Sequence, residues 1–169
     1  MDLVDYVFED KGNYRPSVRV DQLEKPDPDD WELSVVDGDG NCFYHCLCMS
    51  TQRNLTPLRI RHELLKYIDK SNYSLPNITE VIARIYRGIE ADMRGEVVKA
   101  DSWANHEEIQ LCARMYNIVI AVWSAEYQMW SGCFPVDDVF LLSNCRKAVY
   151  LHNDGCHFNL LRRKGKLLQ

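Results

Sequence analysis

The chain has few of the features that mark exported or membrane-embedded proteins. Its first residues, 1–5, carry neither the basic nor the apolar region of a signal peptide. No apolar run approaches the roughly 20 residues that a bilayer-spanning helix needs, and neither an internal repeat nor a low-complexity tract is present. These absences predict a soluble protein without a membrane partner, in a reducing compartment where its 7 cysteines remain free thiols.

Positive charge is also scarce. The 25 acidic side chains outnumber the 20 lysines and arginines, which gives a formal net charge of −5. Nucleic-acid-binding domains usually carry the opposite excess, so we expect no nucleic acid partner, and a basic partner suits this charge better. With 169 residues, 46% of them hydrophobic, the chain is sized for one domain with one core.

The hydrophobic periodicity changes once along the chain. Helical spacing comes first, with two caps of the form Asn-x-x-Glu at Asn77 and Asn105 and a Thr56-Pro57 start. The expected helices cover residues 42–51, 56–69, 77–93 and a stretch after 105 that ends near 117. Strand-like runs then follow at 118–123, 127–134, 139–142, 148–152 and 156–161. Helices before strands predict an α+β fold with a twisted, mostly antiparallel central sheet flanked by helices.

The domain organisation follows from these patterns. Residues 35–162 should form the core of the domain, and residues 1–34 an amino-terminal extension of the same domain. We expect residues 163–169 to form a basic tail that leads into further protein. The continuous β-branched and aromatic run 118–123 predicts a central strand buried on both faces.

A cysteine stands where a glycine-rich turn meets the first predicted helix. Gly38 and Gly40 permit a tight turn just before Cys42. A helix start offers unpaired amide hydrogens and a positive dipole end, which favour thiolate over thiol and mark Cys42 as a nucleophile. The backbone amides of this turn should point toward one oxyanion. The turn consists of Gly38, Asp39, Gly40 and Asn41. The alternative is a buried structural cysteine.

A histidine and an asparagine that could act together with this cysteine lie far downstream in the sequence. His157 and Asn159 lie two apart in a strand-like run, so their side chains point to the same face. Asn159 can accept from one ring nitrogen of His157 and leave the other to face Cys42 as a base. Asp154 is the rival for this orienting role, although it must fold back from a predicted turn. The other histidines have no comparable partner in the sequence.

The acidic residue beside the cysteine does not read as a catalytic acid. A carboxylate at Asp39 would raise the thiol pKa, so ordering of the loop is the better role for it. The run 37–41 resembles the start of a calcium loop, but Cys42 and Cys48 occupy the positions that require glycine and glutamate. Cys46 and Cys48 have no second pair at zinc spacing. We therefore expect neither a metal nor another cofactor.

At these residues the chain resembles the ovarian tumour (OTU) family of cysteine deubiquitinases. That family's signature is Asp-Gly-x-Cys early in the domain and His-aromatic-Asp or His-aromatic-Asn late, here residues 39–42 and 157–159. Trp103, followed five residues later by Glu108, is a third family-like element. The resemblance extends from about Val35 to Leu161 and looks most like the viral OTU proteases at the amino terminus of nairovirus polymerase (L) proteins, which usually carry aspartate where this chain has Asn159.

The resemblance implies a function and an assignment of roles. It implies hydrolysis of the bond after the diglycine tail of ubiquitin and, in some cases, of the interferon-induced ubiquitin-like modifier. It also implies that the enzyme acts as a monomer in the host cytoplasm and suppresses innate immunity. Cys42 would be the nucleophile, His157 the base, Asn159 the orienting group and Asp39 part of the oxyanion loop. Two alternatives stay open: a ubiquitin-binding module with a decayed active site, and a peptidase that cleaves ordinary peptide bonds.

Overall fold

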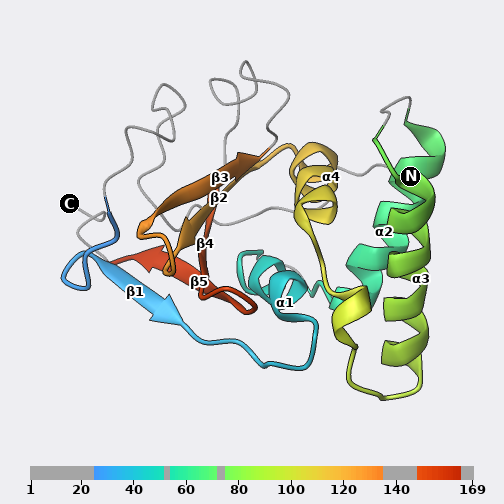
Figure 1. The fold of residues 1–169 in the computed structure, drawn as a ribbon, viewed down its shortest axis with the longest axis horizontal. Coiled ribbons are helices and arrows are strands. Elements are labelled where there is room, and N and C mark those ends of the chain that lie inside the picture. The colour runs from blue at the N-terminus through green and yellow to red at the C-terminus, as the bar shows by residue number, and fades with distance from the viewer. Residues whose placement is uncertain (1–24, 52–53, 72–74, 135–147, 165–169) are drawn as a thin grey trace.

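The computed structural model describes residues 25–51, 54–71, 75–134 and 148–164. Helices lie along one face of a single sheet (Figure 1). No helix within these ranges has the length and apolar character needed to cross a membrane. In chain order the elements are β1 (Trp31–Ser34), α1 (Cys42–Met49), α2 (Pro57–Lys70), α3 (Ile78–Met93), the 3-10 helix η2 (Ala100–Ser102), α4 (His106–Tyr116), β2 (Val119–Ser124), β3 (Met129–Phe134), β4 (Ala148–Asn153) and β5 (Phe158–Arg163).

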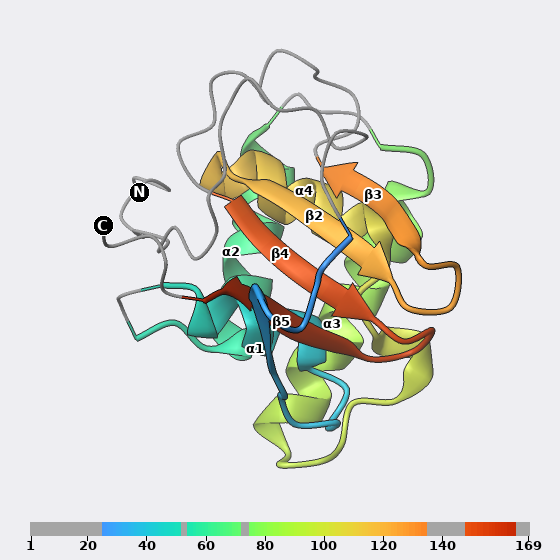
Figure 2. The same ribbon diagram turned by 90° about the vertical axis from the view of Figure 1, so that its left-hand side faces the viewer.

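The strands form one sheet in the order β1-β5-β4-β2-β3. Only the β4–β2 pair is parallel, and the other three pairs are antiparallel. The predicted α+β class with a mostly antiparallel sheet is therefore confirmed. The centre of the described sheet is β4 rather than β2, because β1 adds a strand to the far edge of β5 that the sequence patterns did not identify (Figure 2). The predicted strand 139–142 lies outside the described residues.

Strand β2 is buried on both of its faces, as its continuous apolar run predicted. Ile120 and Val122 point into the main core beneath the helices. Their neighbours Ala121 and Trp123 point the other way, into a second cluster that includes Trp31 and Tyr150. Because both faces exclude water, the strand has no polar alternation for the sequence to show.

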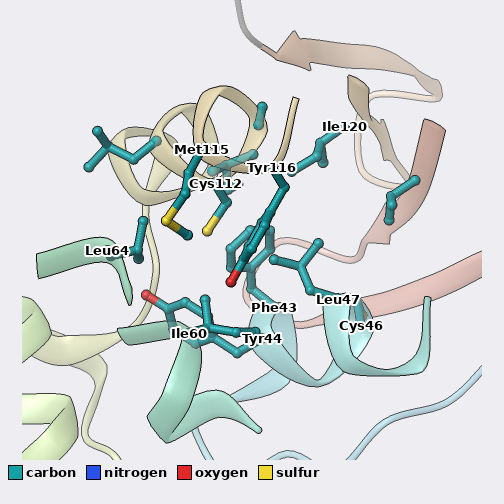
Figure 3. Close-up of a cluster of buried hydrophobic side chains, with 14 of the residues drawn as sticks. Phe43, Tyr44, Cys46, Leu47, Ile60, Leu64, Cys112, Met115, Tyr116 and Ile120 are labelled. Carbon is teal, nitrogen blue, oxygen red and sulfur yellow. The ribbon is translucent and has the colours of Figure 1, made fainter. Parts of the chain in front are cut away.

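The main core lies between the helices and the sheet (Figure 3). The helix α1 sits in the middle of it, with Phe43 and Leu47 almost fully buried. The side chains of α2 and α4 close over the same space, and they include Ile60, Leu64, Cys112 and Met115. On α2, Leu64 is fully buried and Leu58, Leu65 and Ile68 are partly buried against the core. The position of α1 is thus fixed from several sides.

The helix starts follow the predicted caps in two of three cases. Thr56 accepts the N–H of Arg59 at 3.2 Å, and the Glu108 carboxylate accepts the N–H of Asn105 at 3.0 Å. Asn77 precedes α3 in the left-handed conformation, with φ of 60°, and its side chain makes no capping bond. The predicted capping box at Asn77 is wrong, because its left-handed backbone does not have the extended geometry of a side-chain cap.

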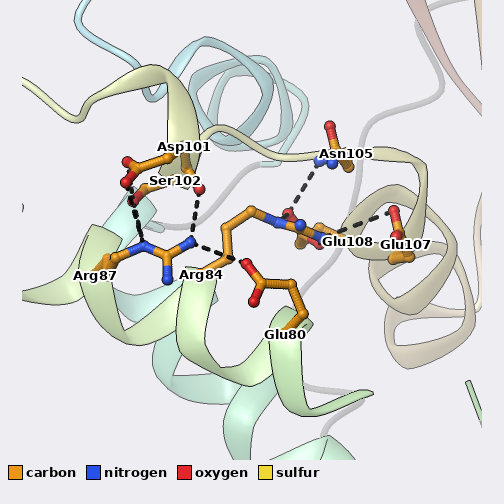
Figure 4. A network of polar contacts seen from close by, with 8 residues as sticks. All are labelled: Glu80, Arg84, Arg87, Asp101, Ser102, Asn105, Glu107 and Glu108. Atoms are coloured by element: carbon orange, nitrogen blue, oxygen red, sulfur yellow. Dashed lines mark hydrogen bonds and ion pairs between the residues drawn. The ribbon is translucent and has the colours of Figure 1, made fainter. Parts of the chain in front are cut away.

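A buried ion pair joins α3 to α4 (Figure 4). Arg84 binds both carboxylate oxygens of Glu108, whose side chain is only 1% exposed. The Glu108 carboxylate holds the pKa of Arg84 above its ordinary value. On the neighbouring turn Arg87 donates to the hydroxyl of Ser102 and to the carbonyl of Asp101, so it ties η2 to the same helix.

We predict that breaking the Arg84–Glu108 pair on one side destabilises the fold. Arg84→Met should lower the free energy of unfolding by about 3–5 kcal/mol, because it leaves a carboxylate buried without its partner. The double variant Arg84→Met/Glu108→Leu should lose less than the single one. Urea unfolding gives the free energy of unfolding of each variant and of the unsubstituted protein. Glu80→Gln, on the exposed part of α3, is the control and should change that free energy by less than about 1 kcal/mol. Equal losses for Arg84→Met and Glu80→Gln would contradict this account.

Candidate active site

The turn before α1 is held against the segment that precedes η2. The N–H of Val98 donates to the carbonyl of Asp39 at 3.1 Å. Gly40 has φ of +85°, and a Cβ on it would lie 2.2 Å from the carbonyl oxygen of Val98. Glycine is therefore required at position 40 both by its backbone conformation and by the close approach of a second chain segment. Gly38, by contrast, has open space where a Cβ would lie.

Cys42 is the first residue of α1 and lies against the start of β5. The N–H of Phe158 points at its sulfur, at 3.5 Å. Burial raises the pKa of the Cys42 thiol, and the nearby charge of Asp39 adds to the rise, although the N–H groups of Phe158, Phe43 and Cys42 itself oppose it. The helix start therefore does not produce the expected thiolate, because burial outweighs the amide groups. The resting group is a thiol that needs a base.

His157 and Asn159 touch, as their spacing predicted. The ring Nε2 of His157 lies 3.0 Å from Asn159 Oδ1. The same Oδ1 accepts the N–H of Val36 at 3.2 Å, and a group that accepts from a backbone amide must be the oxygen of the side chain. The contact therefore assigns the proton to Nε2 and leaves Nδ1 as the lone-pair nitrogen. A neutral ring of this tautomer can accept a proton from a thiol.

Asp154 lies in the turn before His157 and organises the backbone there. Its Oδ1 accepts the N–H groups of Cys156 and His157, at 3.2 and 2.9 Å. These amide bonds hold the pKa of the Asp154 carboxyl below its ordinary value. Asp154 thus shapes the turn that presents the ring, while Asn159 is the residue bonded to a ring nitrogen.

Asp39 has two partners within the nucleophile turn. It accepts the N–H of Asn41 at 3.0 Å, which is the loop-ordering contact expected for it. Its carboxylate also lies 3.1 Å from His45 Nε2, so His45 has an acidic partner that the sequence spacing did not indicate. Burial raises the pKa of Asp39, but His45 and the Asn41 amide together bring it below its ordinary value. The His45 contact was missed because it joins the loop before α1 to a residue of the helix itself, six positions further along the chain.

Asn41 faces inward rather than toward the sulfur. Only 5% of it is exposed, and its side-chain oxygen accepts from the Arg61 guanidinium. Since its N–H is already bonded to Asp39, that amide is occupied within the turn. The part of the turn that borders the site is formed by Gly38 and Gly40, and the oxyanion role of this loop stays a prediction.

A cavity of about 200 Å³ brings the two distant motifs together. Its walls include Cys42 and His157, which are separated by more than a hundred residues of chain, and the remaining lining is Gly38, Gly40, Trp103 and Cys156. Trp103 is held in place by donating its indole N–H to the carbonyl of Val98 at 3.1 Å. Trp103 and Cys156 also line a larger cavity of about 380 Å³.

Two further cysteines of α1 and a group of possible metal ligands lie near the site. Burial raises the pKa of Cys48 to about 12 and that of Cys46 further, which is typical of thiols packed in or against a core. Among the residues in the described ranges, the group that could hold a metal ion is Asp37, Asp39 and His45, with ligand atoms within 4.8 Å of one another. The expectation that the protein needs no metal stays a prediction.

We predict that the two glycines of the turn respond differently to alanine. Gly40→Ala should lower the thermal midpoint and slow alkylation of Cys42, since it forces a positive φ on alanine at a cost of about 1–3 kcal/mol and collides with Val98. Gly38→Ala is the matched control, because no atom lies within 4 Å of its added Cβ. Thermal unfolding and iodoacetamide labelling measure both. Similar behaviour of the two variants would show that Val98 does not confine the turn.

We also predict the pH dependence of Cys42. In His157→Ala, burial still favours the thiol, so iodoacetamide alkylation of Cys42 should rise with pH around a midpoint above that of an unfolded cysteine. The unsubstituted protein should react faster near neutral pH, because the ring can accept the proton. Mass spectrometry of the Cys42 peptide gives the rates, with the urea-unfolded variant as reference. A midpoint below that reference would contradict the raised pKa.

The comparisons with known proteins agree with this geometry. No family model matches the chain. It is 28% identical over 147 residues to the RNA-directed RNA polymerase L of Crimean-Congo hemorrhagic fever virus (strain Nigeria/IbAr10200/1970), a match that covers 79% of this chain but only 3% of the polymerase. The expected resemblance to part of a nairovirus L protein is therefore confirmed, and the chain spans a small fraction of that relative's length.

Solved structures match over most of the chain. The viral OTU domain proteases of Dera Ghazi Khan virus and Taggert virus are 18% and 16% identical, each with a TM-score of 0.50. They cover 81% of this chain each, and 83% and 82% of their own chains. An OTU domain solved in complex with ubiquitin is 14% identical with a TM-score of 0.50, and covers 79% of this chain and 70% of its own. The chain therefore has the fold of the OTU-domain proteases, as its motifs predicted.

Proposed function

We propose that this chain is a viral thiol-dependent deubiquitinase that hydrolyses the peptide or isopeptide bond after the carboxy-terminal diglycine of ubiquitin. The observation that carries the proposal is the meeting of Cys42 and the His157–Asn159 pair around one cavity. A thiol, a ring of defined tautomer and nearby amide groups are the parts that thiol acyl transfer needs. The fold of OTU-domain proteases supports the same reaction class.

The geometry supports the following sequence of steps. His157 Nδ1 accepts the proton of the Cys42 thiol, and the sulfur attacks the carbonyl carbon of the terminal glycine. The imidazolium then gives its proton to the leaving amine, and a thioester remains on Cys42. Water, deprotonated by the same ring, hydrolyses the thioester and restores the thiol. Asn159 holds the ring through both proton transfers, because its oxygen is itself fixed by the Val36 N–H.

The shape of the site suits a substrate without side chains next to the scissile bond. The cavity at Cys42 has a volume of only about 200 Å³, and the glycines 38 and 40 and the Trp103 indole form part of its wall. A diglycine tail needs little space next to the scissile bond, because it has no side chains there. The OTU domain solved with ubiquitin supports ubiquitin as the substrate class.

The proposal extends to the setting in which the enzyme works. Similarity to part of a viral polymerase protein supports a role during infection. Removal of ubiquitin, and of an interferon-induced ubiquitin-like modifier, would suppress innate immune signalling in the host cytoplasm, and the domain would act as a monomer. A panel of ubiquitin chains and ubiquitin-like substrates tests the choice among substrates.

The competing function is a ubiquitin-binding module whose active site has decayed. Asn159 favours this alternative to some degree, because the viral relatives that the chain resembles usually carry aspartate there. The bond to His157 Nε2 argues against decay, since an amide oxygen fixes the same tautomer without adding charge. A ubiquitin probe with a carboxy-terminal electrophile separates the two functions, because only an enzyme becomes covalently labelled at Cys42.

We predict that Cys42→Ala abolishes cleavage of ubiquitin carrying a carboxy-terminal fluorophore and retains ubiquitin binding. The substitution removes the atom that forms the thioester and leaves the surrounding walls in place. Fluorescence release gives the rate, and calorimetry gives the affinity. Cys48→Ala is the matched control, because it removes a thiol from the same helix away from the cavity. Undiminished turnover by Cys42→Ala would overturn the assignment.

A further inference from the structure

An arginine lies completely buried beside the nucleophile turn. Arg61, on α2, is 0% exposed and heads the fully buried side chains by volume. Its guanidinium carbon lies 4.4 Å from the centre of the Tyr44 ring, and one of its nitrogens, Nη1, donates to Asn41 Oδ1. Its Nε and Nη2 are buried without a hydrogen-bond partner among the described atoms. Removing a charge from water is costly, so this position calls for a reason.

Helix α3 has a glycine, Gly88, where it contacts this guanidinium. A Cβ on Gly88 would lie 2.4 Å from Arg61 Nε. Glycine within a helix costs about 1 kcal/mol relative to alanine. At position 88 glycine leaves the space that the guanidinium fills, because a Cβ there would press against it.

The acceptor of the bond is the residue immediately before the nucleophile. Asn41 is the N-cap residue of α1, yet its side chain makes no capping bond to the helix. Its oxygen is turned to Arg61 instead, and its N–H is bonded to Asp39. An asparagine cap usually contributes about 1 kcal/mol to a helix. Three local costs therefore coincide here: a buried charge, a helical glycine and an unused cap.

Local costs that converge on one point of an enzyme are typical of a constraint set by function. We propose that Arg61 is the positioning residue of the nucleophile. Through Asn41 it fixes the last residue of the turn, and so the direction of the Cys42 and Phe43 amide groups that face the sulfur. This inference rests on the proposed function, because its effect is read at Cys42.

A purely structural role for Arg61 makes a different prediction. If the guanidinium only supported the fold, removing it would lower stability, and activity would fall with the folded fraction. If it positions Cys42, an apolar replacement of similar length removes a costly buried charge. This gain offsets the loss of the bond to Asn41, so the stability of the fold does not fall. The rate of the chemical step would fall nonetheless. Stability and kcat therefore move apart only in the second case.

The first test is Arg61→Met, with Lys70→Met as the matched control. Lys70 lies exposed in the last turn of the same helix, and its replacement also removes one positive charge. For Arg61→Met we expect kcat on fluorogenic ubiquitin to fall roughly 10- to 100-fold, with KM within about twofold and an unchanged or higher thermal midpoint. The control should match the unsubstituted protein. An unchanged kcat, or a loss that only follows the thermal midpoint, overturns the proposal.

A second pair of variants acts on the acceptor and keeps the arginine. Asn41→Asp retains an oxygen for the guanidinium and compensates its charge, so it should lose several-fold less kcat than a variant without an acceptor. Asn41→Leu has a similar volume without an acceptor and should lose kcat as Arg61→Met does. The double variant Arg61→Met/Asn41→Leu should lose no more than either single one. Equal kcat for the two Asn41 variants overturns the proposal, even if Arg61→Met does not fold.

The test also separates this inference from the proposed function. The rate of Cys42 alkylation by iodoacetamide at fixed pH needs no ubiquitin. If the unsubstituted protein does not turn over ubiquitin, the proposed function fails, and the alkylation rate alone decides on Arg61. A slower rate in folded Arg61→Met, with no change in Lys70→Met, supports positioning. Equal rates in all three proteins refute it.

Discussion

The contact between the Phe158 amide and the Cys42 sulfur is the constraint on which the site depends, because it is where the start of α1 meets the start of β5. Neither element could supply the site alone. Strand β5 is fixed by β1 on one side and β4 on the other, and α1 is fixed by burial of Phe43 and Leu47 in the main core. The separation of sulfur and ring is therefore set by core packing, and the reactive groups sit on rigid elements, as pre-organised catalysis requires.

The surroundings of Cys42 keep its thiol uncharged at rest. Burial favours the thiol of Cys42, and the partner of His157 is the amide of Asn159. Neither Cys42 nor Asn159 therefore brings a fixed charge to the site. A full charge does lie in the nucleophile turn, on Asp39, where it adds to the rise in the thiol pKa. Other buried charges lie on Arg61 and on the Arg84–Glu108 pair. In this arrangement charge would develop at the site only as the thiol gives up its proton, where amide groups already face the sulfur. An asparagine at position 159 fits this balance, since a carboxylate there would carry a permanent charge into a largely buried position.

Sequence reasoning located the elements and motifs with local signals and failed where the signal was tertiary. The Thr56 and Glu108 caps and the doubly buried run of β2 follow from residue type and spacing. Strand β1 was missed because four residues offer too little periodicity. From the sequence alone, a glycine at position 88 only weakens α3. In the structure, the absence of a side chain there leaves room for the Arg61 guanidinium. A charged residue on the inward side of α2 is also unexpected from hydrophobic patterning, which has no means of foreseeing a buried polar acceptor.

The amino-acid sequence by itself determined the fold class, the nucleophile and histidine motifs, and the pairing of His157 with Asn159, because a two-residue spacing in an extended chain brings side chains to one face. Only the tertiary structure decided that Cys42 and His157 share a cavity, that burial keeps the thiol protonated, and that Asn41 is bonded to a buried arginine. These features depend on distances between segments far apart along the chain and on the exclusion of water, and neither quantity is encoded in local residue spacing.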